Sequence, residues 1–127
     1  MLFRSSELGF LTSLLFFSAY NNSMTGSIPS ELGSLIALNL LIIDVNQFNQ
    51  TIPIEFGNLS HLTSISVNNN NLSGSLPSEL GKLEQLISFL AIGNDLTGSV
   101  PSELGLDRKS TRLNSSHRNT SRMPSSA

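Results

Sequence analysis

Four prolines constrain this chain most strongly, because they recur at a fixed interval of 24 residues. Pro29, Pro53, Pro77 and Pro101 stand in segments that read SIPSELGSL, TIPIEFGNL, SLPSELGKL and SVPSELG. Self-similarity at a period of about 20 to 50 residues is the signature of repeat architectures, in which each unit stacks on its neighbours. The chain is therefore predicted to consist of stacked units.

Apolar residues and an asparagine keep the register of the prolines. In the third unit the apolar positions are Leu59, Leu62, Ile65, Val67, Leu72 and Leu76. The asparagine column is Asn22, Asn46, Asn70 and Asn94. The N-terminal stretch obeys the same register, with Leu14, Phe17 and Ala19 at apolar positions. The segment 62–68 alternates apolar and polar side chains, which predicts one short, half-buried strand in each unit.

The pattern LxxLxxLxLxxNxLxGxIPxxLG over residues 5–106 resembles the plant-type leucine-rich repeat. The resemblance implies an α/β solenoid, a right-handed coil with a parallel β-sheet on its concave face and short helical or 3-10 turns on its convex face. Residues 1–106 then hold about four uncapped repeats, which we expect to be part of a longer protein. Gln50, which replaces a glycine, and Ser5, which replaces a proline, depart from the pattern and weaken local turns without shifting the register.

The resemblance also implies which side chains face outward from the strands and bind a peptide or protein ligand. The candidates are Tyr20, Asn39, Leu40, Ile42, Asp44, Thr63, Ser64, Ser66, Asn68, Ser88, Leu90 and Ile92. The third unit is polar at these positions, whereas the others are unusually apolar. An apolar contact surface and a relaxed, degenerate sequence both explain that difference.

Two sets of asparagines have expected roles. In the family, the asparagine column bonds backbone groups of adjacent coils, so Asn22, Asn46, Asn70 and Asn94 are expected to be structural. Asn21, Asn49, Asn58 and Asn71 stand in N-glycosylation acceptor patterns. Such patterns also arise by chance in an Asn- and Ser-rich repeat, but they are compatible with a secreted ectodomain.

Composition argues against catalysis. The chain has no Cys, which excludes thiol nucleophiles and thiolate metal sites. His61 and His117 are isolated, and Glu31, Glu79 and Glu103 recur at one repeat position, which predicts a solvated ladder rather than an acid/base pair. We expect no catalytic residue, no metal and no cofactor. Residues 1–106 carry two cations against eight carboxylates, which argues against nucleic acid as a partner.

The apolar segment from Leu8 to Tyr20 follows Arg4 and could be taken for the core of a signal peptide. Its agreement with the repeat register explains the same residues better, and it is too short to span a bilayer. We therefore predict no convincing signal peptide or transmembrane segment in this chain. The resemblance places the parent protein at the plasma membrane, with this part extracellular.

The C-terminal residues 107–127, DRKSTRLNSSHRNTSRMPSSA, interrupt the repeat in mid-unit. Written as codons, the segments 107–117 and 121–127 resemble a sequencing-library adapter translated in one frame. The low apolar content of this tail predicts disorder. A basic arm for an anionic partner is the alternative interpretation.

Three hypotheses for function share the solenoid. The first is recognition of a peptide or protein by the ectodomain of a receptor-like kinase or receptor-like protein in signal transduction, with a coreceptor repeat protein as a further partner. In that case any Ser/Thr kinase domain lies outside this chain. The second is a secreted repeat protein acting alone, such as an inhibitor of cell-wall-degrading enzymes. The third is a truncated transcript product without independent function.

Overall fold

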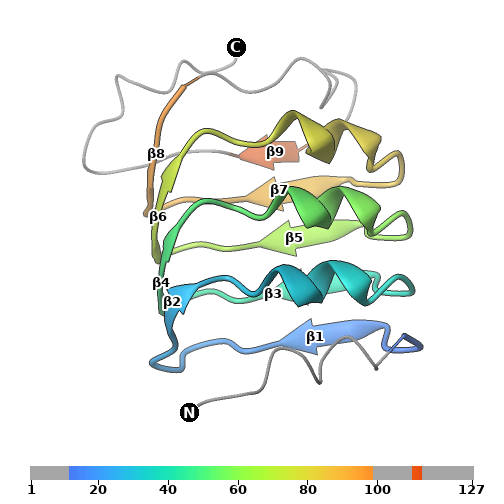
Figure 1. The fold of residues 1–127 in the computed structure, drawn as a ribbon, viewed down its shortest axis with the longest axis horizontal. Coiled ribbons are helices and arrows are strands. Elements are labelled where there is room, and N and C mark those ends of the chain that lie inside the picture. Colours follow the sequence, from blue (N-terminus) through green and yellow to red (C-terminus); the bar gives the residue numbers. More distant parts are fainter. Residues whose placement is uncertain (1–11, 99–109, 113–127) are drawn as a thin grey trace.

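The computed structural model describes residues 12–98 and the backbone of residues 110–112. Strands and 3-10 helices alternate along the chain in a repeating order (Figure 1). The elements are β1 (Phe16–Ser18), β2 (Thr25–Ser27), η1 (Ser30–Ser34), β3 (Leu40–Ile42), β4 (Gln47–Gln50), η2 (Ile54–Asn58), β5 (Ser64–Ser66), β6 (Asn71–Gly74), η3 (Ser78–Lys82), β7 (Ser88–Leu90), β8 (Asp95–Leu96) and β9 (Ser110–Arg112).

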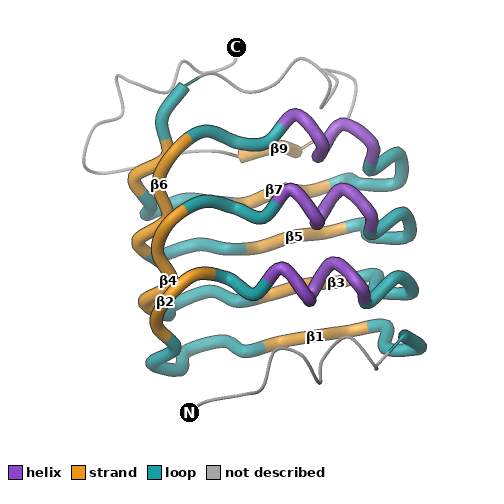
Figure 2. The backbone as a smooth tube through the Cα atoms, viewed as in Figure 1, coloured by secondary structure: helices purple, strands orange, loops and turns teal. Residues whose placement is uncertain are grey.

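The strands form two parallel sheets that run the length of the stack. One sheet has the order β1-β3-β5-β7-β9 and the other β2-β4-β6-β8. In the five-stranded sheet, Phe16 pairs with Leu40 and Leu40 with Ser64, so neighbouring coils are offset by the period of the sequence. The predicted solenoid is confirmed, and the 3-10 helices line the side of each coil in front of the five-stranded sheet (Figures 1 and 2).

The repeated apolar positions make one continuous core between the sheets and the helices. Ile65 and Val67 are fully buried, while Ser64, which precedes Ile65 in β5, is half-buried on the other side of the sheet. The alternation follows from the pleat, which sends successive side chains to opposite faces. Phe56 and Phe89 are the largest fully buried side chains, and each coil depends on its neighbours to cover such groups.

Three prolines of the 24-residue period lie in the described part of the chain, and each of them precedes a 3-10 helix. Pro29, Pro53 and Pro77 have φ values of -65°, -64° and -71° at the N-cap positions, which the pyrrolidine ring favours. Of the two kinds of turn predicted for this side of the coil, the described part of the chain uses 3-10 helices. A Cβ atom on Gly57 would lie 2.6 Å from the carbonyl oxygen of Glu79, so this glycine permits the close approach of η2 and η3.

Two turns in each coil adopt the left-handed conformation, with positive φ. One turn position is occupied by Gly26, Gln50, Gly74 and Gly98, and Gln50 reaches a φ of 69°. The glutamine therefore takes the glycine conformation and leaves the coil register unchanged, as the sequence predicts. The other position holds Asn21, Val45, Asn69 and Gly93, where Val45 has a φ of 60°. A β-branched residue is strained in this region.

The five-stranded sheet ends with β9, which lies within the segment expected to be disordered. Its backbone pairs in parallel with β7, Ser88 opposite Ser110 and Leu90 opposite Arg112. This differs from the expectation at residues 110–112, because a parallel ladder joins backbone groups and does not require the apolar residues of a true repeat. The rest of the predicted tail lies outside the described residues, as do Ser5, Glu103 and His117.

Candidate functional site

The candidate site is the outer face of the five-stranded sheet, whose side chains form rows across the coils. The first row holds Phe16, Leu40, Ser64 and Ser88, and the second holds Ser18, Ile42, Ser66 and Leu90. Backbone hydrogen bonds extend the pairing beyond the strands, as from Asn21 N–H to Asp44 C=O at 2.9 Å. The third row is therefore Tyr20, Asp44, Asn68 and Ile92.

The face is apolar on both sides of a polar centre. Phe16 and Tyr20 in the first coil are 52% and 58% exposed, and Ile92 in the fourth coil is 39% exposed. Leu40, Ile42 and Leu90 are half-buried. The third coil between them presents serine and asparagine instead. An exposed aromatic and aliphatic surface of this kind is typical of a contact site.

Asp44 organises the polar centre of the face. Its Oδ1 accepts hydrogen bonds from Ser66 Oγ at 2.7 Å and from the Asn68 backbone N–H at 2.8 Å, and its Oδ2 lies 2.9 Å from the same Ser66 hydroxyl. Asn68 Nδ2 donates in turn to Ser66 Oγ at 3.2 Å. Asn68 Oδ1 accepts from the Ile92 N–H at 2.7 Å. The network joins three coils and holds the carboxylate in one orientation.

The network changes the part that Ser66 plays among the candidate residues. Its side chain is only 7% exposed and its hydroxyl is bonded to Asp44, so it positions the carboxylate instead of offering a contact. Sequence reasoning placed both residues on one face but missed this bond. The only available signal was that Asp44 and Ser66 lie in the adjacent rows of adjacent coils.

The remaining candidates lie at the edge of the rows, where the chain enters the strands. Asn39 is exposed, and its carbonyl oxygen accepts hydrogen bonds from the N–H of Thr63 at 2.9 Å and from Thr63 Oγ1 at 3.1 Å. Ser64 and Ser88 are half-buried neighbours in the first row. The candidate residues therefore form one surface, with Ser66 beneath it.

The asparagine column lies behind this face and bonds to the backbone. Asn70 Oδ1 accepts from the Phe48 N–H at 3.1 Å, while its Nδ2 donates to the carbonyl oxygens of Ile43 at 3.1 Å and Val67 at 3.2 Å. Asn46 and Asn94 make equivalent bonds. Asn22 at the start of the stack is exposed and donates to Tyr20 O at 3.2 Å. The amides satisfy buried peptide groups, and consecutive asparagines share the Ile43 and Val67 carbonyl oxygens, which ties each coil to the next.

The four glycosylation candidates are all exposed: Asn21, Asn49, Asn58 and Asn71. Asn49 and Asn71 are paired neighbours in β4 and β6, so glycans on both would start from adjacent strands about 4.8 Å apart. Asn58 ends η2 and Asn21 lies in a turn. Exposure makes each side chain accessible in the folded coil.

The other titratable groups singled out in the sequence lie apart from the face. Glu31 and Glu79 lie in the first turns of η1 and η3, and Glu55 occupies the same position in η2. His61 is exposed, with Nδ1 3.2 Å from the Ile36 carbonyl oxygen. Among the described residues, no group of three or more His, Cys, Asp or Glu side chains is arranged to hold a metal ion.

Comparisons with known proteins identify the fold. The sequence profile of the Leucine Rich Repeat family matches residues 61–83. No curated protein sequence matches the chain. The BIR3–SERK2 complex from Arabidopsis thaliana contains a similar structure, with 36% identity and a TM-score of 0.71 over 87% of this chain and 61% of that one.

Two larger receptors are also similar. The TDR receptor shares 38% identity over 86% of this chain and 19% of its own, with a TM-score of 0.79. The ectodomain of the Arabidopsis thaliana membrane receptor kinase GASSHO1/SCHENGEN3, in complex with CASPARIAN STRIP INTEGRITY FACTOR 2, shares 30% identity over 88% of this chain and 13% of its own, with a TM-score of 0.79. The chain thus spans less than two thirds of each relative.

The chain has the leucine-rich-repeat fold, which it shares with the ectodomain of a plant membrane receptor kinase. Within the part of the chain that the structure describes, no helix is both long and apolar enough to cross a bilayer.

Proposed function

We propose that the outer face of the five-stranded sheet recognises a peptide or protein ligand, as part of the extracellular domain of a plasma-membrane receptor in signalling. The observation that carries the proposal is the aromatic and aliphatic surface, formed by Phe16, Tyr20 and Leu40, beside the ordered polar centre at Asp44. Such a surface on a rigid sheet holds contact groups in place before the ligand arrives, which lowers the entropy cost of binding.

The similar proteins support this proposal. One is the ectodomain of a receptor kinase in complex with CASPARIAN STRIP INTEGRITY FACTOR 2, and another is part of the BIR3–SERK2 complex. By analogy, the partners of this chain are a peptide or protein ligand and a coreceptor repeat protein, and its parent carries a membrane anchor and a kinase domain. The accessible acceptor asparagines, such as Asn58, fit an extracellular glycoprotein.

The test is a selection of phage-displayed random octapeptides on the immobilised chain. The double variant Ser64→Arg/Ser88→Arg places two long cationic side chains in the first row and should weaken binding of the selected peptides by about tenfold or more. The matched control, Ser34→Arg/Ser60→Arg, adds the same charge at exposed positions on the helix side of the coil. It should leave binding within about twofold.

Circular dichroism and a thermal melt should show that both double variants remain folded. Selected peptides that bind equally well to the two double variants, or a selection without enrichment on the folded protein, would contradict the proposal.

A further inference from the structure

We infer that the first two coils bind an extended peptide that carries an arginine and, two positions before or after it, an apolar residue. Tyr20 and Asp44 would bind the guanidinium group, and Ile42 the apolar side chain. The inference rests on the proposed function and names the ligand chemistry of that face.

Asp44 carries a negative charge that lacks a cationic partner within the described side chains. The sequence from 12 to 98 contains six carboxylates, and of these only Asp44 belongs to the rows of the outer face. The one Lys or Arg in that range is Lys82, which ends η3 on the helix side of the coil. A half-buried carboxylate attracts a cation more strongly than one in open water, because fewer water molecules screen it.

The carboxylate is held in place before a ligand arrives. Ser66 Oγ and the Asn68 N–H donate to it at 2.7 and 2.8 Å, and the Asn68 side chain is itself bonded to Ser66 and to the Ile92 N–H. These donors are neutral, so they orient Asp44 without cancelling its charge. The one hydroxyl proton of Ser66 is within reach of both carboxylate oxygens, which leaves acceptor capacity on Oδ2 for an incoming donor.

Tyr20 supplies the second element of a guanidinium site. It stands next to Asp44 in the third row, because Asn21 N–H donates to Asp44 C=O at 2.9 Å across the adjacent coils. Its side chain is 58% exposed, so the ring is accessible. Guanidinium groups stack on aromatic faces while their N–H groups bond carboxylates, and neighbouring strands about 4.8 Å apart allow one group to do both.

Ile42 sets the spacing of the apolar contact. It lies two residues before Asp44 on the same chain and the same face, about 7 Å away in an extended strand. An extended peptide presents side chains i and i+2 to one face at the same interval. Leu40, half-buried, and Phe16, 52% exposed, continue the apolar surface beyond Ile42. The preferred ligand motif is therefore Arg-x-Leu or its reverse.

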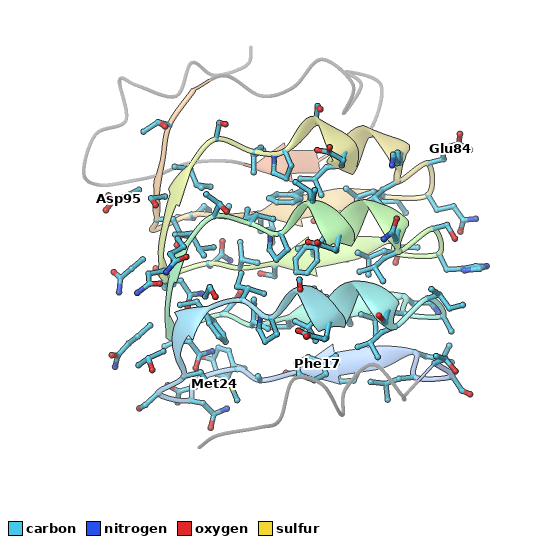
Figure 3. All side chains as sticks on the ribbon, viewed as in Figure 1. Phe17, Met24, Glu84 and Asp95 are labelled. Atoms are coloured by element: carbon cyan, nitrogen blue, oxygen red, sulfur yellow. The ribbon has the colours of Figure 1, made fainter. Side chains whose placement is uncertain are left out.

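The surplus of carboxylates over cations in residues 12–98 favours approach of a basic peptide. This net negative charge would attract a basic peptide even without a specific site. The test therefore has to distinguish binding at Asp44 from non-specific attraction by the net charge. Glu84 provides that control. It is exposed at the turn before β7, at the opposite end of the coil from Asp95 in Figure 3.

The probe is a fluorescein-labelled octapeptide, Gly-Ser-Gly-Arg-Ser-Leu-Gly-Ser, compared by fluorescence anisotropy with the same peptide carrying glutamine for arginine. The arginine peptide should bind the full chain about tenfold tighter or better. Asp44→Asn should remove most of that preference, while Glu84→Gln should change the affinity by less than about twofold. Tyr20→Ala should weaken binding about threefold, and Tyr20→Phe, which keeps the ring, should not.

Equal affinity for the two peptides, a preference that survives Asp44→Asn, or an equal loss in Glu84→Gln would overturn the inference. So would the absence of measurable binding by the arginine peptide to a chain that circular dichroism shows to be folded. The random-library selection separates the two claims. Selected peptides that lack basic residues but depend on Ser64 and Ser88 would leave the proposed function standing without the arginine site, whereas peptides that ignore the face would remove both.

Discussion

The second and third coils have the same fold but differ in their agreement with the repeat pattern. The family profile matches residues 61–83, which include the third coil with β5, β6 and η3. The second coil has β3, β4 and η2 in the same register, yet it carries Val45 and Gln50 at turns with positive φ and apolar residues on the outer face. The buried columns and the asparagines therefore carry the fold, and outward and turn positions are free to vary at a limited cost.

The largest effect should come from the asparagine column, which both coils share. Asn70→Ala leaves the buried Phe48 N–H without its partner and removes one of the two amide donors from each of the Ile43 and Val67 carbonyl oxygens. The free energy of unfolding should fall by about 3 kcal/mol. Asn46→Ala should cost a similar amount, because its bonds are equivalent. Urea denaturation measures both. Exposed Asn22→Ala is the control, with an expected change under about 1 kcal/mol, and an equal loss there would refute the structural role of burial.

The next effect concerns the packing between these two coils. Gly57→Ala would put a Cβ atom 2.6 Å from Glu79 O and 3.0 Å from Glu79 Cβ. The coils must then separate, so the free energy of unfolding should fall by about 2 kcal/mol. Asn58→Ala is the matched control, an exposed position in the same helix, with an expected change within about 0.5 kcal/mol. Equal denaturation midpoints for the two variants would show that the close approach is not required.

A reciprocal exchange at the turn position that Val45 and Asn69 share tests whether the backbone of the second coil is strained there. Val45→Asn should stabilise the protein by about 1 kcal/mol, because asparagine tolerates the left-handed region far better than valine. Asn69→Val should destabilise it by a similar amount, since Asn69 has a φ of 57°. Thermal melting of the two variants and the parent checks the signs. If both exchanges destabilise, local packing outweighs backbone strain at this position.

The smallest effect on stability is expected at the turn position that Gln50 and Gly74 share. Gln50→Gly should raise the free energy of unfolding by about 0.5 kcal/mol, because relief of strain at a φ of 69° is partly offset by the greater freedom of glycine in the unfolded chain. The reverse change, Gly74→Gln, should cost more, since a Cβ there would lie 2.9 Å from Thr51 Cγ2. Urea denaturation compares the pair, and a stabilising Gly74→Gln would contradict this account.

The sequence by itself determined the period and the buried columns, and its resemblance to leucine-rich repeats implied the parallel sheet and the outward-facing side chains. Periodicity suffices for the buried columns because it dictates which face of a strand is covered when similar units stack. Leu62, Ile65 and Val67 could be assigned to the core from their spacing alone. The unchanged register at Gln50 was also predicted from the pattern, whereas the left-handed conformation of Gln50 was not.

Only the tertiary structure decided how outward side chains interact between coils. The hydrogen bonds from Ser66 and Asn68 to Asp44, the burial of Ser66 and the adjacency of Asn49 and Asn71 depend on distances across the stack. The pairing of β9 with β7 also had no signal in the side chains. Periodicity assigns a residue to a face, but a hydrogen bond needs donor and acceptor about 3 Å apart, and that separation is set by the packing of neighbouring coils.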